Sequence, residues 1–473
     1  MNEWETIVGL EVHCELRTAT KLFCSCRNAF GDEPNTNICP VCLGLPGSLP
    51  VLNRMAVELA MRIGAALHCE VRGSIFHRKN YFYPDMPKDY QISQYDEPLN
   101  VDGWLELPDG TRVGIERAHL EEDTGKTTHI GVSGRIHGAD FSLVDYNRAG
   151  VPLVEIVSRP DIRSAEQART YVSELRAILV ATGASDGKME EGSLRVDANV
   201  SIHRPGTPFG TRCEIKNLNS LRSLGRAIDY EARRQVDLLE SGGTVRQETR
   251  HWNEDQGRTS TLRSKEEAYD YRYFPEPDLV PIDPSDEWKD GVRAALPPLP
   301  ADRRRTLAAR AGMAPADVAL LVDLDLDGLV ASAIDLGADP RIAVNRAANE
   351  VASAIEAAAT LDPRAFATVA MMEGEGRLTA TQAKVVLAEL LTSGGDPEAI
   401  AEERGFAPVD TGLVESAVDG AIAADPGAWA RYVGGEDKVA GMFVGQVMKA
   451  TGGKADGKAV TALLQQKRAA ARA

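Results

Sequence analysis

The chain has 473 residues, of which 43% are hydrophobic and 26% charged, and a net charge of −17. This length is too great for one hydrophobic core and predicts two or three domains of an ordinary globular protein. The acidic balance argues against general affinity for nucleic acid, which usually leaves a basic footprint. The sequence does not open with a basic segment followed by an apolar run, and it contains no long uncharged apolar run. We therefore expect a cytosolic protein that does not span a membrane.

The first predicted element is a β-strand at residues 8–16. Its apolar residues alternate with Glu11, His13 and Glu15, so one face is expected to join a core while the three polar side chains share the other. An edge strand with a solvated face would show the same pattern. A second interpretation is that Glu11 and His13 form one wall of a metal and nucleotide site.

Four of the seven cysteines are clustered, as Cys24-x-Cys26 and Cys39-x-x-Cys42. Two short-spaced thiol pairs can close a tetrahedral zinc site, and four thiolates leave no open position on the metal. We therefore expect a structural Zn²⁺ bound by these four side chains. The alternative is four unrelated reduced thiols.

Residues 78–95 combine cations, aromatic rings and amides in a turn-rich segment that begins Arg78-Lys79-Asn80-Tyr81. Arg and Lys bind phosphates, and aromatic rings stack on bases. A loop anchored to its domain by aromatic side chains would have the same composition.

Acidic residues recur further along the chain. Glu121, Glu122 and Asp123 are consecutive, and such a group repels itself unless it is solvated or holds a cation. Mg²⁺ takes oxygen ligands, usually one or two carboxylates together with phosphate oxygens. Glu155 lies inside an apolar run, where a carboxylate is costly to bury unless it meets a cation or donors, although an outward-facing strand residue is an equal alternative.

The adjacent Gly125-Lys126-Thr127 does not form a P-loop, because Leu120 occupies the position of the first required glycine. If the protein uses ATP, it does so without this motif. Glu190 and Glu191 precede a predicted strand at 194–202, whose polar face includes Asp197.

The remaining elements of the N-terminal part predict an α+β fold. Helices are expected at about 53–68, 164–182 and 220–240, the first two with a capping residue at their start, and a further strand at 212–216 includes Lys216. Strands with one apolar and one polar face indicate a largely antiparallel sheet that is packed on one side.

Beyond the proline-rich residues 296–300 the sequence has helical periodicity almost to its end, with a weaker break near 404–408. We therefore expect three domains, at 1–295, 296–405 and 406–473, with the cysteine cluster at 24–42 inside the first. Residues 431–473 contain eight Lys and Arg against three Asp and Glu, an excess of +5. A solvated helix face explains this excess as readily as a binding surface does.

Six motifs in order along the chain resemble the GatB/GatE family of tRNA-dependent amidotransferase subunits, and specifically the B subunit of the GatCAB heterotrimer. The resemblance covers essentially the whole chain. The motifs are Gly9-Leu10-Glu11-Val12-His13, residues 78–85, residues 119–123, Val144-Asp145-Tyr146-Asn147-Arg148, residues 188–195 and residues 270–278.

The resemblance implies a glutamine-synthetase-like cradle followed by helical and YqeY-like tail domains, which bind the tRNA body. It implies an ATP-dependent carbon–nitrogen ligase with glutamine as amido donor. The cradle would use ATP and Mg²⁺ to phosphorylate the side-chain carboxylate of Glu on tRNA(Gln) or of Asp on tRNA(Asn). Ammonia from the A (glutaminase) subunit would then displace phosphate, while a C subunit binds at the A–B interface. Zinc would be structural, since some members of the family lack the thiols.

The site residues follow from the same resemblance. It implies catalytic roles for Glu11, His13, Lys79, Glu122 and Glu155, and magnesium binding by His13, Glu121, Glu122 and Glu155. We further expect Arg78, Tyr81, Glu191, Asp197 and Lys216 to bind the nucleotide.

Two other functions are compatible with the motifs. A non-catalytic scaffold with a structural zinc would bind tRNA but would not support tRNA-stimulated ATP cleavage. A free-standing amide ligase of the glutamine-synthetase type would act without tRNA and would leave the long helical part unexplained. The sequence does not distinguish Asp-tRNA from Glu-tRNA as substrate.

Overall fold

The computed structural model describes residues 4–131, 139–264, 271–358, 360–406, 411–451, 455 and 457–472. The chain divides into two compact units, with the boundary along the chain between Asp302 and Arg303. The boundary expected at 295/296 falls slightly before this point, because Leu296 and Leu299 still pack on the core of the first unit. Within the described residues, no helix combines the length and the apolar character needed to cross a membrane.

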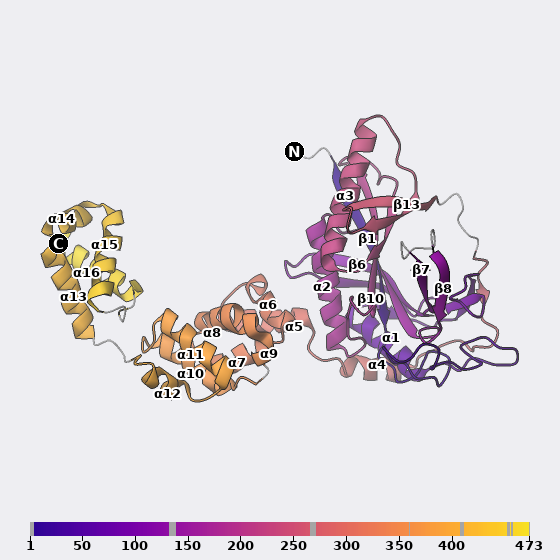
Figure 1. Cartoon of the computed structure of the whole chain (residues 1–473), viewed down its shortest axis with the longest axis horizontal. Helices are drawn as coiled ribbons and strands as arrows, with labels where there is room; N and C mark the ends of the chain where they lie inside the picture. The colour runs from indigo at the N-terminus through magenta and orange to yellow at the C-terminus, as the bar shows by residue number, and fades with distance from the viewer. Residues whose placement is uncertain are drawn as a thin grey trace. The chain divides into compact units, whose positions relative to one another are not determined.

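A large sheet forms the first unit (Figure 1). Its strand order is β13-β12-β11-β10-β1-β9-β6-β4-β3-β14, with β5 paired to β6 and β2 to β5. Between described strands, β11 and β12 are parallel and the other pairs are antiparallel. The strands are β1 (Glu5–Glu15), β2 (Glu70–Val71), β3 (His77–Asn80), β4 (Tyr90–Ser93), β5 (Asn100–Glu106), β6 (Arg112–Glu122), β9 (Pro152–Ser158), β10 (Leu194–His203), β11 (Cys213–Leu218), β12 (Glu248–Asn253), β13 (Arg258–Ser264) and β14 (Phe274–Pro275).

Three helices cover one face of this sheet: α1 (Arg54–Ala66), α2 (Ala165–Ala181) and α3 (Leu221–Glu240) (Figure 1). Their N-caps are Asn53, Ser164 and Ser220, whose side-chain oxygens each accept a hydrogen bond from a backbone N–H of the first turn. A fourth helix, α4 (Asp286–Ala294), packs on α1. The apolar side of β1, from Val8 to Cys14, is buried in the core that these helices share with the sheet.

The opposite face of the sheet is polar, because Glu11 and His13 alternate with the buried residues of β1. A separate hairpin of β7 (Lys126–Gly131) and β8 (Ala139–Asp145) lies on this side (Figure 1). The predicted α+β fold on a largely antiparallel sheet is confirmed.

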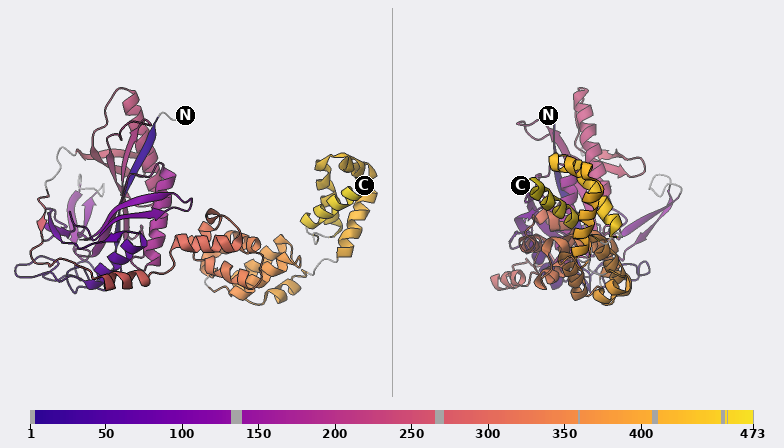
Figure 2. Two further views of the ribbon diagram at one scale, coloured as in Figure 1. Left: turned by 180° about the vertical axis from the view of Figure 1, so that it is seen from behind. Right: turned by 90° about the vertical axis from the view of Figure 1, so that its left-hand side faces the viewer.

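The second unit consists of helices joined by short turns in its described part, as both views in Figure 2 show. One hydrophobic core extends from Leu307 to Ala401 and a second from Val418 to Leu464. Residues 407–410, 452–454 and 456, which fall in the tail domain expected from the sequence, lie outside the described residues. The elements are α5 (Pro300–Ala311), η2 (Pro315–Val318), α6 (Ala319–Asp323), α7 (Asp327–Asp335), α8 (Pro340–Arg346), η3 (Ala347–Val351), η4 (Ala352–Ala354), α9 (Ile355–Ala358), α10 (Pro363–Gly374), α11 (Ala380–Ser393), α12 (Pro397–Glu403), α13 (Thr411–Ala424), α14 (Pro426–Gly434), η5 (Asp437–Val439), α15 (Ala440–Ala450) and α16 (Gly457–Arg472).

Candidate active site

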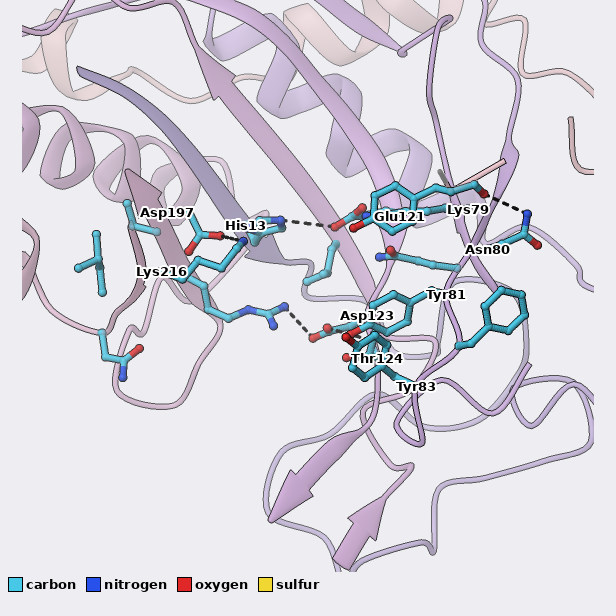
Figure 3. Close-up of a pocket in the computed structure, with 18 residues that line it drawn as sticks. His13, Lys79, Asn80, Tyr81, Tyr83, Glu121, Asp123, Thr124, Asp197 and Lys216 are labelled. Carbon is cyan, nitrogen blue, oxygen red and sulfur yellow. Dashed lines mark hydrogen bonds and ion pairs between the residues drawn. The ribbon is translucent and has the colours of Figure 1, made fainter. Parts of the chain in front are cut away.

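A cavity of about 690 Å³ opens on the polar face of the sheet (Figure 3). This volume is within the range of roughly 300–1,000 Å³ that is usual for small-molecule sites. Side chains from seven strands (β1, β3, β4, β6, β9, β10 and β11) and from the loops beside them line it. They include His13, Lys79, Asn80, Tyr81, Phe82, Tyr83, Glu121, Asp123, Thr124, Arg195, Asp197, Lys216 and Tyr271.

The register of four antiparallel strands places a row of charged and imidazole groups on the polar face of the sheet, and two of them, His13 and Arg195, line the cavity. His13 on β1 lies directly opposite Arg195 on β10 and, on its other side, opposite Glu155 on β9. Glu155 in turn lies opposite His119 on β6. Directly opposed residues on antiparallel strands project from the same face, so the fold brings together side chains that are up to 182 positions apart in the sequence (195 − 13).

Three side chains on this face could hold a metal ion. The ligand atoms of His13, Glu121 and Glu155 all lie within 4.8 Å of one another. His13 Nε2 is 3.6 Å from Glu121 Oε1, and a dashed line marks this contact in Figure 3. Two carboxylates with open space beside them suit Mg²⁺, which fills its remaining positions with water and phosphate oxygens. The residues present therefore fit the metal that was expected from the sequence.

His119 orients the Glu155 carboxylate, since its Nε2 is 3.1 Å from Glu155 Oε2. Burial on its own would raise the pKa of Glu155, but the charges of His119 and His13 and the hydrogen bond from His119 outweigh it. The pKa of Glu155 is consequently held below its ordinary value, and the side chain is an ionised oxygen donor at neutral pH.

Glu11 and Asp197 form the adjacent pair across β1 and β10. Glu11 accepts a hydrogen bond of 2.9 Å from Asn199 Nδ2 and is not one of the three clustered ligands. Burial, followed by the charge of Glu155, raises the pKa of Glu11. Lys216 Nζ contacts Asp197 at 2.7 Å and Glu214 at 3.0 Å, so this lysine is already neutralised by two carboxylates.

Two predicted site residues, Lys79 on β3 and Tyr81 directly after it, line the cavity. Lys79 places its Nζ 4.8 Å from the centre of the Tyr271 ring. Tyr81 stacks on Tyr83 at a centroid distance of 4.7 Å. Both side chains border the cavity with the exposed ring of Phe82, and an aromatic and cationic rim of this kind suits a nucleotide.

The structure does not bring Glu122 to the magnesium candidates. Successive strand residues project to opposite faces, so Glu122 points away from Glu121. Its Oε1 instead accepts hydrogen bonds from Lys88 Nζ at 2.5 Å and from Ile92 N at 2.8 Å, and it is buried beside Cys42. We therefore remove Glu122 from the magnesium and catalytic sets.

Arg78 and Glu191 are also engaged elsewhere. Arg78 makes a bidentate ion pair with the buried Glu276, at 2.6 and 2.8 Å, because β3 pairs with β14. Glu191 pairs with Lys188 on the surface at 2.7 Å. Neither residue is among those that line the cavity, so we do not retain them as nucleotide ligands.

Sequence reasoning missed three residues of the site. His119 is two positions before Glu121 on the same strand, and the alternation of β6 would have placed both on one face. Asp123 and Arg195 line the cavity as an ion pair of 2.8 Å. No local signal links these two residues, because Asp123 follows the end of β6 whereas Arg195 lies on β10.

The four clustered cysteines converge as expected. The sulfur atoms of Cys24, Cys26, Cys39 and Cys42 lie within 4.8 Å of one another, and Cys39 Sγ and Cys42 Sγ are 3.9 Å apart. A tetrahedral site with Zn–S bonds of about 2.3 Å places its sulfurs about 3.8 Å apart. The donor set and its spacing therefore fit Zn²⁺ with no position left for substrate.

Comparison with known proteins gives two family matches. Residues 6–290 match the GatB/GatE catalytic domain, and residues 329–467 match the GatB domain of the YqeY type. Three relatives, from Frankia casuarinae, Salinispora tropica and Carboxydothermus hydrogenoformans, are named as the B subunit of aspartyl/glutamyl-tRNA(Asn/Gln) amidotransferase. They are 50%, 50% and 47% identical to this chain; the alignments cover 98%, 98% and 99% of it, and 95%, 96% and 99% of the relatives.

Proposed function

This chain belongs to the GatB/GatE family of tRNA-dependent amidotransferase subunits, and on this premise we propose that its cavity activates the side-chain carboxylate of a misacylated aminoacyl-tRNA. The substrates are Glu-tRNA(Gln), Asp-tRNA(Asn) or both, in keeping with the names of the relatives. The products are the corresponding Gln-tRNA(Gln) and Asn-tRNA(Asn). The protein is thus the activating subunit of an ATP-dependent ligase with glutamine as amido donor.

The observation that supports this proposal most directly is the cluster of His13, Glu121 and Glu155, the first two of which line a cavity together with cationic and aromatic side chains. Phosphoryl transfer requires little covalent chemistry from the protein. It requires oxygen ligands for the metal that accompanies ATP, and cations that neutralise the phosphates. The cavity offers both within one space.

The reaction has two steps. In the first, an oxygen of the substrate carboxylate attacks the γ-phosphorus of ATP, the bond to the β–γ bridging oxygen breaks, and ADP leaves. In the second, the lone pair of ammonia attacks the carbonyl carbon of the acyl phosphate. The C–O bond then breaks, phosphate leaves with that oxygen, and the nitrogen loses a proton to give the amide.

His13, Glu121 and Glu155 are the residues that would hold Mg²⁺, with Glu11 and Asp197 beside them. When bound, Mg²⁺ supplies charge neutralisation for the β- and γ-phosphates. Lys79 and Tyr81 contact the nucleotide from the rim, and Lys216 fixes the orientation of Asp197. Cys24, Cys26, Cys39 and Cys42 hold a structural Zn²⁺ outside the cavity.

The chain acts in a heterotrimer with a glutaminase A subunit, which supplies ammonia, and a C subunit. The helical domain at 296–405 and the tail domain at 406–473 bind the tRNA body. If this assignment of the tail is right, deletion from residue 407 onward raises KM for aminoacyl-tRNA in a salt-dependent manner, because the contacts are made to phosphates, and leaves ATP binding unchanged. Salt-independent or unchanged KM would contradict it.

The site is tested with Glu121→Gln in the assembled complex, using tRNA-dependent ATP hydrolysis as the assay. We expect at least a 100-fold loss of kcat, because the substitution removes one of two clustered carboxylates. Glu116→Gln is the matched control, since Glu116 is on the same strand but its side chain is 56% exposed and pairs with Arg117. Equal rates for the two variants would refute the site. ATP hydrolysis that does not depend on tRNA in the unmodified complex would refute the function.

A further inference from the structure

Arg195 lies directly opposite the proposed metal ligand His13, across β1 and β10, and it lines the cavity. Arg195 is neither a proposed metal ligand nor a proposed nucleotide ligand, so its guanidinium is available to another group of the substrate.

Asp123 holds this guanidinium in place. The Asp123 side chain is only 4% exposed, and its Oδ2 accepts a hydrogen bond from Arg195 Nη2 at 2.8 Å. Arg148 Nε approaches the same oxygen at 3.2 Å, while Thr124 N donates to Oδ1 at 2.8 Å. The carboxylate is thereby fixed from both sides.

The two arginines differ in what else they bind. Arg148 also donates to the backbone carbonyls of Thr124 and Gly125, at 3.0 Å each. Arg195 has five N–H groups, and its Nε is buried without a hydrogen-bond partner among the described residues. Arg195 therefore retains donors beside the cavity, whereas Arg148 is committed to the loop.

The unused donors of Arg195 suit an anion better than the ammonium of Lys216 does. Two guanidinium groups share the carboxylate of Asp123, and the carboxyls of Glu15 and Glu121 also act on Arg195, so its charge is compensated while some of its N–H groups stay available. The Nζ of Lys216 already contacts two carboxylates within 3.0 Å. A planar guanidinium can bind two oxygens of a phosphoryl group in parallel, which an ammonium cannot do.

We propose that Arg195 is a further catalytic residue, which donates hydrogen bonds to the phosphoryl group as it leaves the acyl phosphate, and that Asp123 is its positioning residue. When the C–O bond breaks, the electron pair passes to the phosphate oxygen. Donors that are already oriented stabilise this developing charge without reorganisation. The proposal rests on the proposed function and specifies how the same cavity stabilises its leaving group.

The test compares Arg195→Ala and Arg195→Lys in the assembled complex, with misacylated tRNA, ATP and Mg²⁺. We expect about a 100-fold loss of kcat for Arg195→Ala, which is the usual effect of removing one oriented donor, and a loss of about 10-fold for Arg195→Lys. The KM for aminoacyl-tRNA should change by less than about twofold, since the contact forms in the transition state. Guanidinium chloride at low millimolar concentration should restore part of the kcat of Arg195→Ala.

Arg159 provides a matched control, because it makes the same contact outside the cavity, with Nη2 at 2.8 Å from Asp102 Oδ1 and a side chain that is 51% exposed. Arg159→Ala should retain wild-type kcat and show no rescue by guanidinium. Asp123→Asn should lower kcat about 10-fold, and the loss in the Asp123→Asn/Arg195→Lys double variant should be smaller than the product of the single losses.

The outcomes separate the inference from the proposed function. If the unmodified complex cleaves ATP only with tRNA while Arg195→Ala has normal kcat, the inference is wrong and the function stands. If Arg195→Ala does not fold, as judged by circular dichroism, Arg195→Lys decides: normal kcat overturns the inference. A loss of kcat that guanidinium does not relieve, together with an equal loss in Arg159→Ala, also overturns it, because both would then reflect structure alone.

Discussion

The buried ion pair between Lys88 and Glu122 provides a prediction that can be worked through from the structure. The side chains are 7% and 3% exposed, and Lys88 Nζ is 2.5 Å from Glu122 Oε1. At this separation the Coulomb attraction is about 6–7 kcal/mol for an effective dielectric constant of about 20, much of which is offset by desolvation of the two charges.

Replacing Lys88 by Met removes the attraction but leaves the desolvated carboxylate. Such changes cost about 3–5 kcal/mol. The lower part of this range applies here, because the backbone N–H of Ile92 continues to donate to Glu122 at 2.8 Å. For a unit of this size, a loss of about 3 kcal/mol corresponds to a decrease in Tm of roughly 5 °C.

The assay is urea-induced unfolding of the zinc-loaded protein, followed by tryptophan fluorescence. The control is the double variant Lys88→Met/Glu122→Leu, in which neither charge remains; it should regain all but about 1 kcal/mol of the loss, because replacing a buried pair by apolar residues is often neutral. A loss below about 1 kcal/mol for Lys88→Met, or a double variant as unstable as the single one, would refute the reasoning.

Three further predictions concern the glycines of the cysteine-containing segment, the loss of stability at acid pH and the binding of zinc. A Cβ on Gly44, which has φ +64°, would collide with Lys88 Cγ, whereas one on Gly47, at φ +84°, would meet nothing within 4 Å. Gly44→Ala should therefore lower the free energy of unfolding by more than Gly47→Ala, which incurs only the backbone cost of about 1–2 kcal/mol; equal losses would contradict this. The pKa of Glu155 is lowered in the folded state, so its ionised form stabilises the protein above the ordinary value of 4.5, and this stabilisation is lost as the pH falls below it. The Tm difference between wild type and Glu155→Gln without Mg²⁺ should accordingly shrink between pH 6 and pH 3, and a constant difference would be the opposing result. Cys26→Ser should bind less than one zinc per chain by elemental analysis and lower Tm by several degrees, while the residual folded complex keeps kcat within about threefold of wild type; full zinc content in the variant would exclude the site.

Local patterns in the sequence are sufficient to predict the main helices and strands of the first unit. The alternation in β1 places Glu11 and His13 on the polar face, and the capping residues Asn53 and Ser164 mark the starts of α1 and α2. These predictions succeed because they depend on residues within one turn or one pleat of each other. The grouping of the four cysteines succeeds for a similar reason, since both pairs lie in one short segment.

The contacts between strands explain what the sequence could not predict. Glu121 and Glu122 are adjacent and look equivalent in the sequence. They project to opposite faces of β6, so Glu121 is a magnesium candidate while Glu122 pairs with Lys88. Arg78 is a residue type that commonly binds phosphate. It is instead paired with Glu276, which follows β14 and is 198 positions further along the chain. The pairing of Asp123 with Arg195 likewise follows from the strand order alone. Such partners cannot be assigned without the topology of the sheet.

The central claim is that the cavity transfers the γ-phosphoryl group of ATP to the side-chain carboxylate of the aminoacyl-tRNA. It is tested most directly by labelling both oxygens of that carboxylate with ¹⁸O and analysing the inorganic phosphate formed by the assembled complex. Because the acyl phosphate breaks at its C–O bond, each phosphate released should contain one ¹⁸O atom, and Glu121→Gln should release phosphate at a much lower rate. Unlabelled phosphate, with the ¹⁸O retained in the aminoacyl-tRNA or lost to water, would contradict the account.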